Sequence, residues 1–193
     1  MSYTTRFANL TDKENLLELY KRVSKIIGGI ARTESEITET YIINNLKKSI
    51  NNGICLVIDQ PNGDKIIAEI HCYKLPPSVF DHILSELTIV VDPEYQNQGL
   101  GTLLFNSLLK HIENNRTDIL RVELIARESN VKAITFYEKL GFKIEGRFER
   151  RIDNKTENFE ADIPMAWFNK NYTPQNITAM TADSLSAEST RIC

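Results

Sequence analysis

The sequence lacks the features that would assign it to several common classes of protein. Its 23 Lys and Arg residues against 26 Asp and Glu give a net charge of −3, so there is no basic excess. We therefore expect neither nucleic acid nor an anionic membrane as a partner. The longest unbroken apolar run, Ile54–Ile58, is far shorter than the ~20 residues of a membrane-spanning helix. The first ten residues also lack the apolar core of a secretory signal.

Cysteine is scarce as well, with three widely spaced residues at positions 55, 72 and 193. An odd number at such spacing predicts reduced thiols and a cytoplasmic protein. The three histidines have no metal-ligand spacing, so no bound metal is expected. What remains is an ordinary globular composition, 41% hydrophobic and 25% charged over 193 residues, which predicts one domain.

Hydrophobic periodicity predicts the order β-α-α-β-β-β-α-β-α-β-β, a mixed α/β sheet with helices against it. Thr11 or Asp12 is the expected N-cap of the first helix, and Gly28-Gly29 its end. The predicted helices cover 12–27, 33–52, 99–114 and 130–140. The predicted strands cover 3–9, 54–58, 65–73, 86–91, 120–127, 142–152 and 158–167. From residue 172 the composition shifts to Ser, Thr and Ala, so we expect a single domain over 1–171 and a flexible tail over 172–193.

One strand runs into a glycine-containing turn and then directly into a helix, around Gly99 and Gly101. The first N–H groups of a helix have no partner inside it and carry partial positive charge, so such a turn suits a pyrophosphate. It is neither of the common nucleotide motifs. Leu104 stands where the dinucleotide fingerprint needs its third glycine, and no Lys stands between Gly101 and Thr102 as a P-loop requires.

Two blocks of sequence resemble a known family. The run Val91-Asp-Pro-Glu-Tyr-Gln-Asn-Gln-Gly-Leu-Gly101 resembles the acyl-CoA signature of the GNAT superfamily of N-acyltransferases, [Gln/Arg]-x-x-Gly-x-[Gly/Ala]. The run Asn130-Val-Lys-Ala-Ile-Thr-Phe-Tyr-Glu-Lys-Leu-Gly-Phe142 resembles a later motif of the same superfamily. The resemblance covers residues 3 to about 170 and is strongest toward the amino-acid and phosphinothricin-type acetyltransferases. It implies the GNAT fold, a mostly antiparallel mixed sheet with helices on both faces, and an acetyl-CoA-dependent N-acetyltransferase.

The resemblance also implies where acetyl-CoA would bind. The backbone of Ile89, Val90 and Val91 would hold the pantetheine arm and the thioester, and its N–H groups would stabilise the developing oxyanion. Asn130 would hold the same arm. Backbone N–H groups around the turn would surround the pyrophosphate; they belong to Gln96, Asn97, Gln98, Gly99, Leu100, Gly101 and Thr102.

The expected reaction needs a base, because an alkyl amine with a pKa near ~10 is mostly protonated at neutral pH. Glu86 is the preferred base. It lies on the same predicted strand as the thioester-binding backbone, and phosphinothricin-type acetyltransferases have a Glu at the matching position. Glu123, on the neighbouring predicted strand, is the reserve candidate. Glu69 and His71 lie on another strand, where each alone is expected to be structural.

Tyr137 matches the tyrosine that superfamily members use to protonate the departing thiolate. Asn130 lies seven residues earlier, about two helical turns or ~10 Å away on roughly the same face. The alternatives are that Tyr137 is a core aromatic residue beside Phe136 and Leu140, and that Asn130 is an N-cap.

The acceptor is expected between the first helices and the last hairpin, around 28–32 and 147–162. Glu160 and Asp162 would attract an ammonium, and Arg32, Arg150 or Arg151 would pair with a carboxylate. A small amine such as an amino acid is therefore the expected acceptor, with a protein N-terminus or lysine as the alternative. A catalytically silent acyl-CoA-binding module is the alternative of a different class. Superfamily members are often dimers, so the resemblance offers a homodimer as the candidate oligomeric state.

Overall fold

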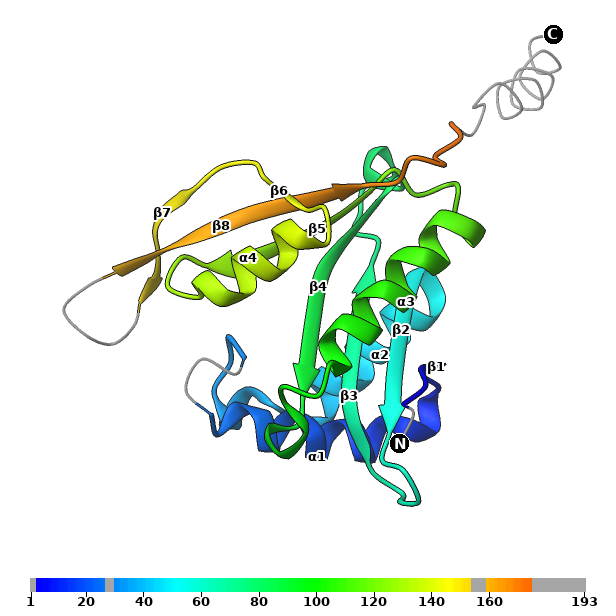
Figure 1. The fold of residues 1–193 in the computed structure, drawn as a ribbon, viewed down its shortest axis with the longest axis vertical. Helices are drawn as coiled ribbons and strands as arrows, with labels where there is room; N and C mark the ends of the chain where they lie inside the picture. Colours follow the sequence, from blue (N-terminus) through cyan, green and yellow to red (C-terminus); the bar gives the residue numbers. More distant parts are fainter. Residues whose placement is uncertain (1–2, 27–29, 154–158, 175–193) are drawn as a thin grey trace, which may run out of the picture.

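The computed structural model describes residues 3–26, 30–153 and 159–174. One long sheet carries helices on both of its faces (Figure 1). The helices are α1 (Lys13–Ser24), α2 (Glu39–Asn52), α3 (Leu100–Asn115) and α4 (Val131–Lys139). The strands are β1 (Arg6–Phe7), β2 (Gly53–Asp59), β3 (Ile66–Tyr73), β4 (Ile83–Val91), β5 (Arg121–Arg127), β6 (Lys143–Ile144), β7 (Phe148–Asp153) and β8 (Phe159–Phe168).

The first half of the sheet, β1-β2-β3-β4, is antiparallel, and its two middle strands, β2 and β3, are buried on both faces. Alternate residues of β2 point to opposite sides, as the pleat requires. Ile54, Leu56 and Ile58 join the core under α3, whereas Cys55 and Val57 join the core under α1 and α2. The two cores hold α2 and α3 on opposite faces of β2 and β3 (Figure 1).

The sheet opens between its two halves. The strands β4 and β5 run parallel and pair only at Ile83 with Arg121 and at Leu84 with Val122. Beyond Leu84 they diverge, and Figure 1 shows β5 leaving with β8 while β4 continues beside β3. The edge of β4 that faces β5 is therefore free of strand pairing over the rest of its length.

The second half of the sheet is built on β8, which pairs with β5, β6 and β7. The predicted strand over 142–152 is in fact two short strands, β6 and β7, that meet β8 at different places. The predicted turn of this hairpin falls on residues outside the described ranges. Otherwise the predicted element order is confirmed, as is the mostly antiparallel mixed sheet with helices on both faces.

Helix starts are where the predictions are least accurate. Asp12, one of the two expected residues, stands at the N-cap position of α1, but its side chain makes no capping hydrogen bond to that helix. The side-chain cap belongs to Asn9, which begins a short 3₁₀ turn before α1 and accepts from the Thr11 N–H at 2.8 Å. Asp12 closes the capping box instead, accepting from the Asn9 N–H at 2.8 Å. The predicted helix over 33–52 is likewise interrupted, and α2 begins only after Thr38. The expected end of the first helix at 28–29 lies outside the described residues.

Three further predictions can be compared with the described ranges. Gly141 ends α4 in the left-handed conformation (φ 94°), as expected. Cys55 and Cys72 are free and buried. Of the expected tail only 172–174 are described, and there the Thr173 N–H donates to the Thr117 carbonyl at 2.9 Å. Within the described chain, no helix is both long enough and apolar enough to cross a bilayer.

Candidate active site

The turn between β4 and α3 presents a run of free backbone N–H groups. Asp92 fixes its start, because the carboxylate accepts from the Glu94 N–H at 3.1 Å and from Arg22 Nε at 2.7 Å. The first bond of the helix runs from the Leu103 N–H to the Gly99 carbonyl at 3.0 Å. Among described residues, none accepts a hydrogen bond from a backbone N–H of 96–102. These groups form a partially positive concavity that suits a phosphate.

A groove of about 440 Å³ lies over this turn, between β4, α3 and α4. Eight of the predicted acetyl-CoA residues line it: Ile89, Val91, Gln96, Asn97, Gly99, Leu100, Gly101 and Thr102. Val90 and Gln98 do not. The Val90 side chain is buried in the core under α1 and α2, and Gln98 accepts from the Tyr3 hydroxyl at 2.8 Å. From Val90 only the main chain is therefore available to a ligand.

Gly99 is needed for its backbone conformation. It caps α3 with φ 82° in the left-handed region, which disfavours any residue with a Cβ. A Cβ built there would meet no described atom within 4 Å, so the space above the turn is open. Free N–H groups beside open space fit the pyrophosphate of an acyl-CoA.

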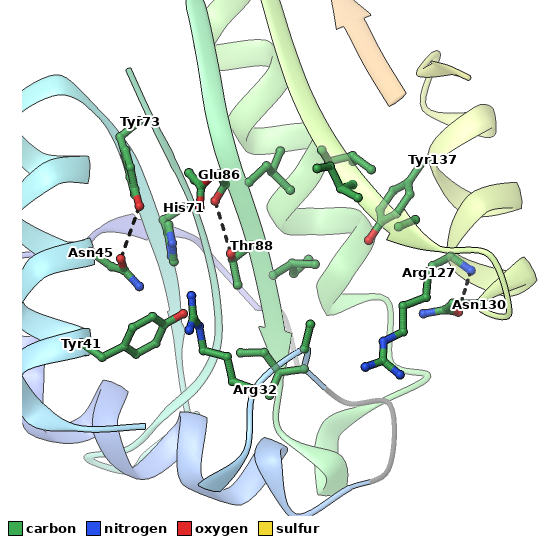
Figure 2. A pocket seen from close by; sticks show the side chains of 18 residues that line it. Arg32, Tyr41, Asn45, His71, Tyr73, Glu86, Thr88, Arg127, Asn130 and Tyr137 are labelled. Carbon is green, nitrogen blue, oxygen red and sulfur yellow. Dashed lines mark hydrogen bonds between the residues drawn. The ribbon is translucent and has the colours of Figure 1, made fainter. Parts of the chain in front are cut away.

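A second cavity, of about 270 Å³, adjoins the groove and shares Ile89 and Ala133 with it. It lies in the opening between β4 and β5. The predicted residues Glu86, Asn130 and Tyr137 all line it. Figure 2 shows Tyr137 and Asn130 at one end of this cavity and His71, Tyr41 and Arg32 at the other. The two cavities therefore meet at Ile89 and Ala133, with the phosphate-binding turn on one side and Glu86 on the other.

Glu86 occupies a bulge in β4. His71 pairs with Thr88 and Tyr73 pairs with Ser85, so the one residue between them on β3 lies opposite two residues of β4, Glu86 and Leu87. Glu86 takes a positive φ of 56° there, which is unusual for a residue other than glycine. Its side chain is exposed, and no hydrogen bond or ion pair joins its carboxylate to another residue of the described ranges. The carboxylate is therefore available to a ligand.

Tyr137 is at once a packing residue and a residue of the cavity wall. Its ring lies 5.4 Å from that of Phe105 and 6.0 Å from that of Phe142, measured between centroids. Burial raises the pKa of its hydroxyl, which keeps it protonated at neutral pH. Asn130 is the N-cap of α4, as one alternative predicted, and its Oδ1 accepts from the Ala133 N–H at 3.2 Å.

The reserve base, Glu123, is already engaged. Its carboxylate accepts from the Ser85 hydroxyl at 2.5 Å and from Arg121 at 3.0 Å. It lines a neighbouring cavity of about 300 Å³ that also reaches Glu86. Glu86 has the freer side chain of the two carboxylates, and it borders both the 270 Å³ and the 300 Å³ cavity.

Of the five charged residues expected to bind the acceptor, all within the described ranges, only Arg32 faces the 270 Å³ cavity; Ile30 and Ala31 of the same stretch line it too. Arg32 lies over the Tyr41 ring, with its guanidinium carbon 4.5 Å from the ring centroid. Arg150, Arg151, Glu160 and Asp162 are absent from the cavity wall, and Arg151 pairs with Asp162 at 3.3 Å. Their expected role at this cavity is therefore not supported by its geometry.

Several residues of the wall were not predicted from the sequence, namely Tyr41, Asn45, Tyr73 and Arg127. These come from α2, β3 and the end of β5, which meet only because β4 and β5 separate. His71, which was expected to be structural, also lines the cavity. The one signal available was the Glu69-x-His71 spacing, which puts both side chains on one face of a strand.

Comparison with known proteins identifies the class. The sequence model of the Acetyltransferase (GNAT) family matches residues 16–142, so the chain belongs to this family and the predicted resemblance is confirmed. Over 87 residues the chain is 40% identical to the [Ribosomal protein bS18]-alanine N-acetyltransferase of Escherichia coli strain K12. That match covers 44% of this chain and 57% of the relative, so it spans little more than half of the relative's length.

Solved structures agree with the fold. An acetyltransferase of the GNAT family from Streptococcus pneumoniae superposes with a TM-score of 0.69 at 27% identity, covering 86% of this chain and 99% of that one. A phosphinothricin acetyltransferase from Sinorhizobium meliloti, in complex with AcCoA, gives a TM-score of 0.77 at 16% identity and covers 91% and 95%. At that identity the second likeness concerns the fold alone.

Proposed function

We propose that the chain is an N-acetyltransferase that moves the acetyl group of acetyl-CoA directly to a primary amine. The observation that carries this proposal is the junction of the two cavities at Ile89 and Ala133, beside the unpaired edge of β4. When bound, acetyl-CoA would supply the reactive thioester. Residues 96–102 would hold its pyrophosphate, and the main chain of 89–91 together with Asn130 would hold its pantetheine arm.

Three groups would then carry the chemistry. Glu86 accepts a proton from the acceptor nitrogen, since its carboxylate is free and borders the cavity. Backbone N–H groups on the open edge of β4 stabilise the negative charge that develops on the carbonyl oxygen. Tyr137 donates its hydroxyl proton to the departing thiolate, and its raised pKa keeps that proton in place until it is needed.

The acceptor that the cavity supports best is a small amine that also carries a carboxylate, such as an amino acid. Arg32 and Arg127 enter the same cavity as Glu86, and a guanidinium binds a carboxylate through paired hydrogen bonds. A protein N-terminus is the second candidate, favoured by the 40% identity with the ribosomal-protein alanine acetyltransferase. We place the reaction in the cytoplasm on the ground that the two described cysteines are free thiols.

The test is to follow CoA release from acetyl-CoA with a panel of amino acids, polyamines and peptides with free N-termini. We expect turnover with at least one amino acid, and we expect Glu86→Gln to lower kcat by at least ~10²-fold. Glu138→Gln is the matched control, because this exposed carboxylate on α4 borders none of the three cavities. Tight acetyl-CoA binding without turnover on any amine would instead indicate a binding module.

A further inference from the structure

A buried polar cluster lies directly behind the wall of the 270 Å³ cavity. Glu69 and His71, two residues apart on β3, are only 1% and 3% exposed. The Glu69 carboxylate is within hydrogen-bond distance of three groups: the Tyr20 hydroxyl at 2.7 Å, His71 Nδ1 at 2.8 Å and the Cys55 thiol at 3.2 Å. The Tyr20 hydroxyl and the Cys55 thiol both donate to this carboxylate, which therefore acts as their common acceptor.

The protonation of these neighbours fixes the direction of each hydrogen bond. Burial, reinforced by the Glu69 charge, raises the pKa of the Tyr20 hydroxyl and that of the Cys55 thiol well above their ordinary values, so both remain donors. Tyr20 gives its one proton to Glu69, and its oxygen lies 3.3 Å from His71 Nδ1. Because Nδ1 faces two oxygen acceptors, it carries the ring proton in the neutral imidazole.

With the proton on Nδ1, His71 Nε2 is unprotonated, and its lone pair can accept a proton. In the described ranges no group hydrogen bonds to Nε2, and the ring lines the cavity. His71 is also the cross-strand partner of Thr88, two residues from Glu86 on β4 (Figure 2). The imidazole base therefore borders the same space as Glu86, and its other nitrogen is held by a buried carboxylate.

The acetyl transfer of the proposed function, on which this inference rests, requires the acceptor nitrogen to lose two protons, and this leaves a role for a second base. The acceptor enters as an ammonium and ends as an amide, so its nitrogen loses two protons while the N–C bond forms and the C–S bond breaks. One proton ends on the sulfur and the other in solvent. The proton that the ammonium loses first, before attack, is the harder of the two to remove. An imidazole, with an ordinary pKa near ~6.5, is a stronger base than a carboxylate near ~4.3.

We propose that His71 Nε2 accepts the first proton, the one that the ammonium loses before attack, and passes it to solvent. Glu86 accepts the second proton, which replaces the one that Tyr137 gives to the sulfur. Glu69 and Tyr20 are positioning residues, because they hold the imidazole from behind and do not themselves line the cavity. The arrangement uses the buried carboxylate to hold the ring and its tautomer in place.

The decisive experiment compares two acceptors of the same shape on wild type and His71→Gln. One is an alkyl amine from the panel; the other is its analogue with a trifluoromethyl group on the amine carbon, whose weakly basic amine is already neutral at the assay pH. We expect His71→Gln to lower kcat on the alkyl amine by about 10²-fold and to leave the fluorinated acceptor near its wild-type rate. Equal fractional losses on both acceptors, or no loss on either, would overturn the proposal.

A control and an independent measurement separate this inference from the proposed function. His111→Gln removes a histidine outside the cavity and should match wild type on both acceptors. Wild-type turnover tests the function, whereas the variant's ratio between the two acceptors tests His71. The ¹⁵N shifts of His71 in the wild-type protein should show a protonated Nδ1 and a bare Nε2, and the opposite tautomer would refute the role without any assay. Glu69→Gln should change these shifts and cause the same acceptor-dependent loss.

Discussion

Replacing Tyr137 with Phe separates the two roles that this residue has in the structure. The ring contacts with Phe105, Phe136 and Phe142 would all remain in the variant. The hydroxyl, by contrast, has no hydrogen-bond partner in the described part of the chain. Its removal should therefore change the free energy of unfolding by less than ~0.5 kcal/mol, as for a substitution that breaks no contact.

The effect on catalysis should be much larger if the hydroxyl is the general acid. Losing a positioned proton donor lowers kcat by roughly 10²–10⁴-fold, equivalent to about 2.7–5.4 kcal/mol in the activation free energy. Tyr137→Ala provides the contrast, because it also removes the ring. For this half-buried residue we expect a loss of about 2–3 kcal/mol in stability, somewhat below that of a fully buried aromatic residue.

The assay measures CoA release, acetyl-CoA affinity and thermal unfolding on the same preparations of wild type, Tyr137→Phe and Tyr137→Ala. The catalytic reading requires that the Phe variant lose kcat while its unfolding midpoint and acetyl-CoA affinity stay at wild-type values. If Tyr137→Phe turns over as fast as wild type, Tyr137 is a core aromatic residue and the acid lies elsewhere. If it unfolds as readily as the Ala variant, the hydroxyl has a structural role that the geometry does not explain.

Two further predictions concern the phosphate-binding turn and a surface ion pair. Gly99→Val should weaken acetyl-CoA binding at least ~10-fold in a calorimetric titration. The left-handed φ of 82° costs a β-branched residue ~1–2 kcal/mol, and the new side chain would fill the open space above the turn. The control variant Gly146→Ala should bind acetyl-CoA normally. A side-chain hydrogen bond from Arg116, with a second from Lys74, lowers the pKa of Asp118 from 3.8 to about 2. Since a lowered pKa stabilises the fold above the unfolded-state value, this contribution should be complete at neutral pH and disappear as pH falls from about 4 to about 2. Urea unfolding should show the difference between wild type and Asp118→Asn shrinking over that window, and a constant difference would contradict the ion-pair assignment.

The sequence predicts most of the fold because each element buries a regular pattern. The unbroken apolar run Ile54–Ile58 of β2 and the stripe of Leu100, Leu104 and Leu108 in α3 suffice to place both in the core of the sheet. The motif around Gly99 similarly predicts the phosphate-binding turn, since one backbone conformation and a run of free N–H groups follow from local sequence. Helix starts were predicted less well, because several Asn, Thr and Asp residues can cap a helix and tertiary contacts choose among them.

The cavity could not be predicted, because it depends on where strands stop pairing. Alternation along β4 would put Leu84, Glu86 and Val90 on one face of the sheet, yet Leu84 is buried in the core under α3 and Val90 in the core under α1 and α2. The bulge at Glu86 reverses the alternation between them. It occurs just beyond Leu84, the last residue of β4 that pairs with β5, so Glu86 falls where the sheet opens. One extra residue in a strand thus brings Glu86 to the same cavity as His71 and Tyr137, and no periodicity in the sequence records it.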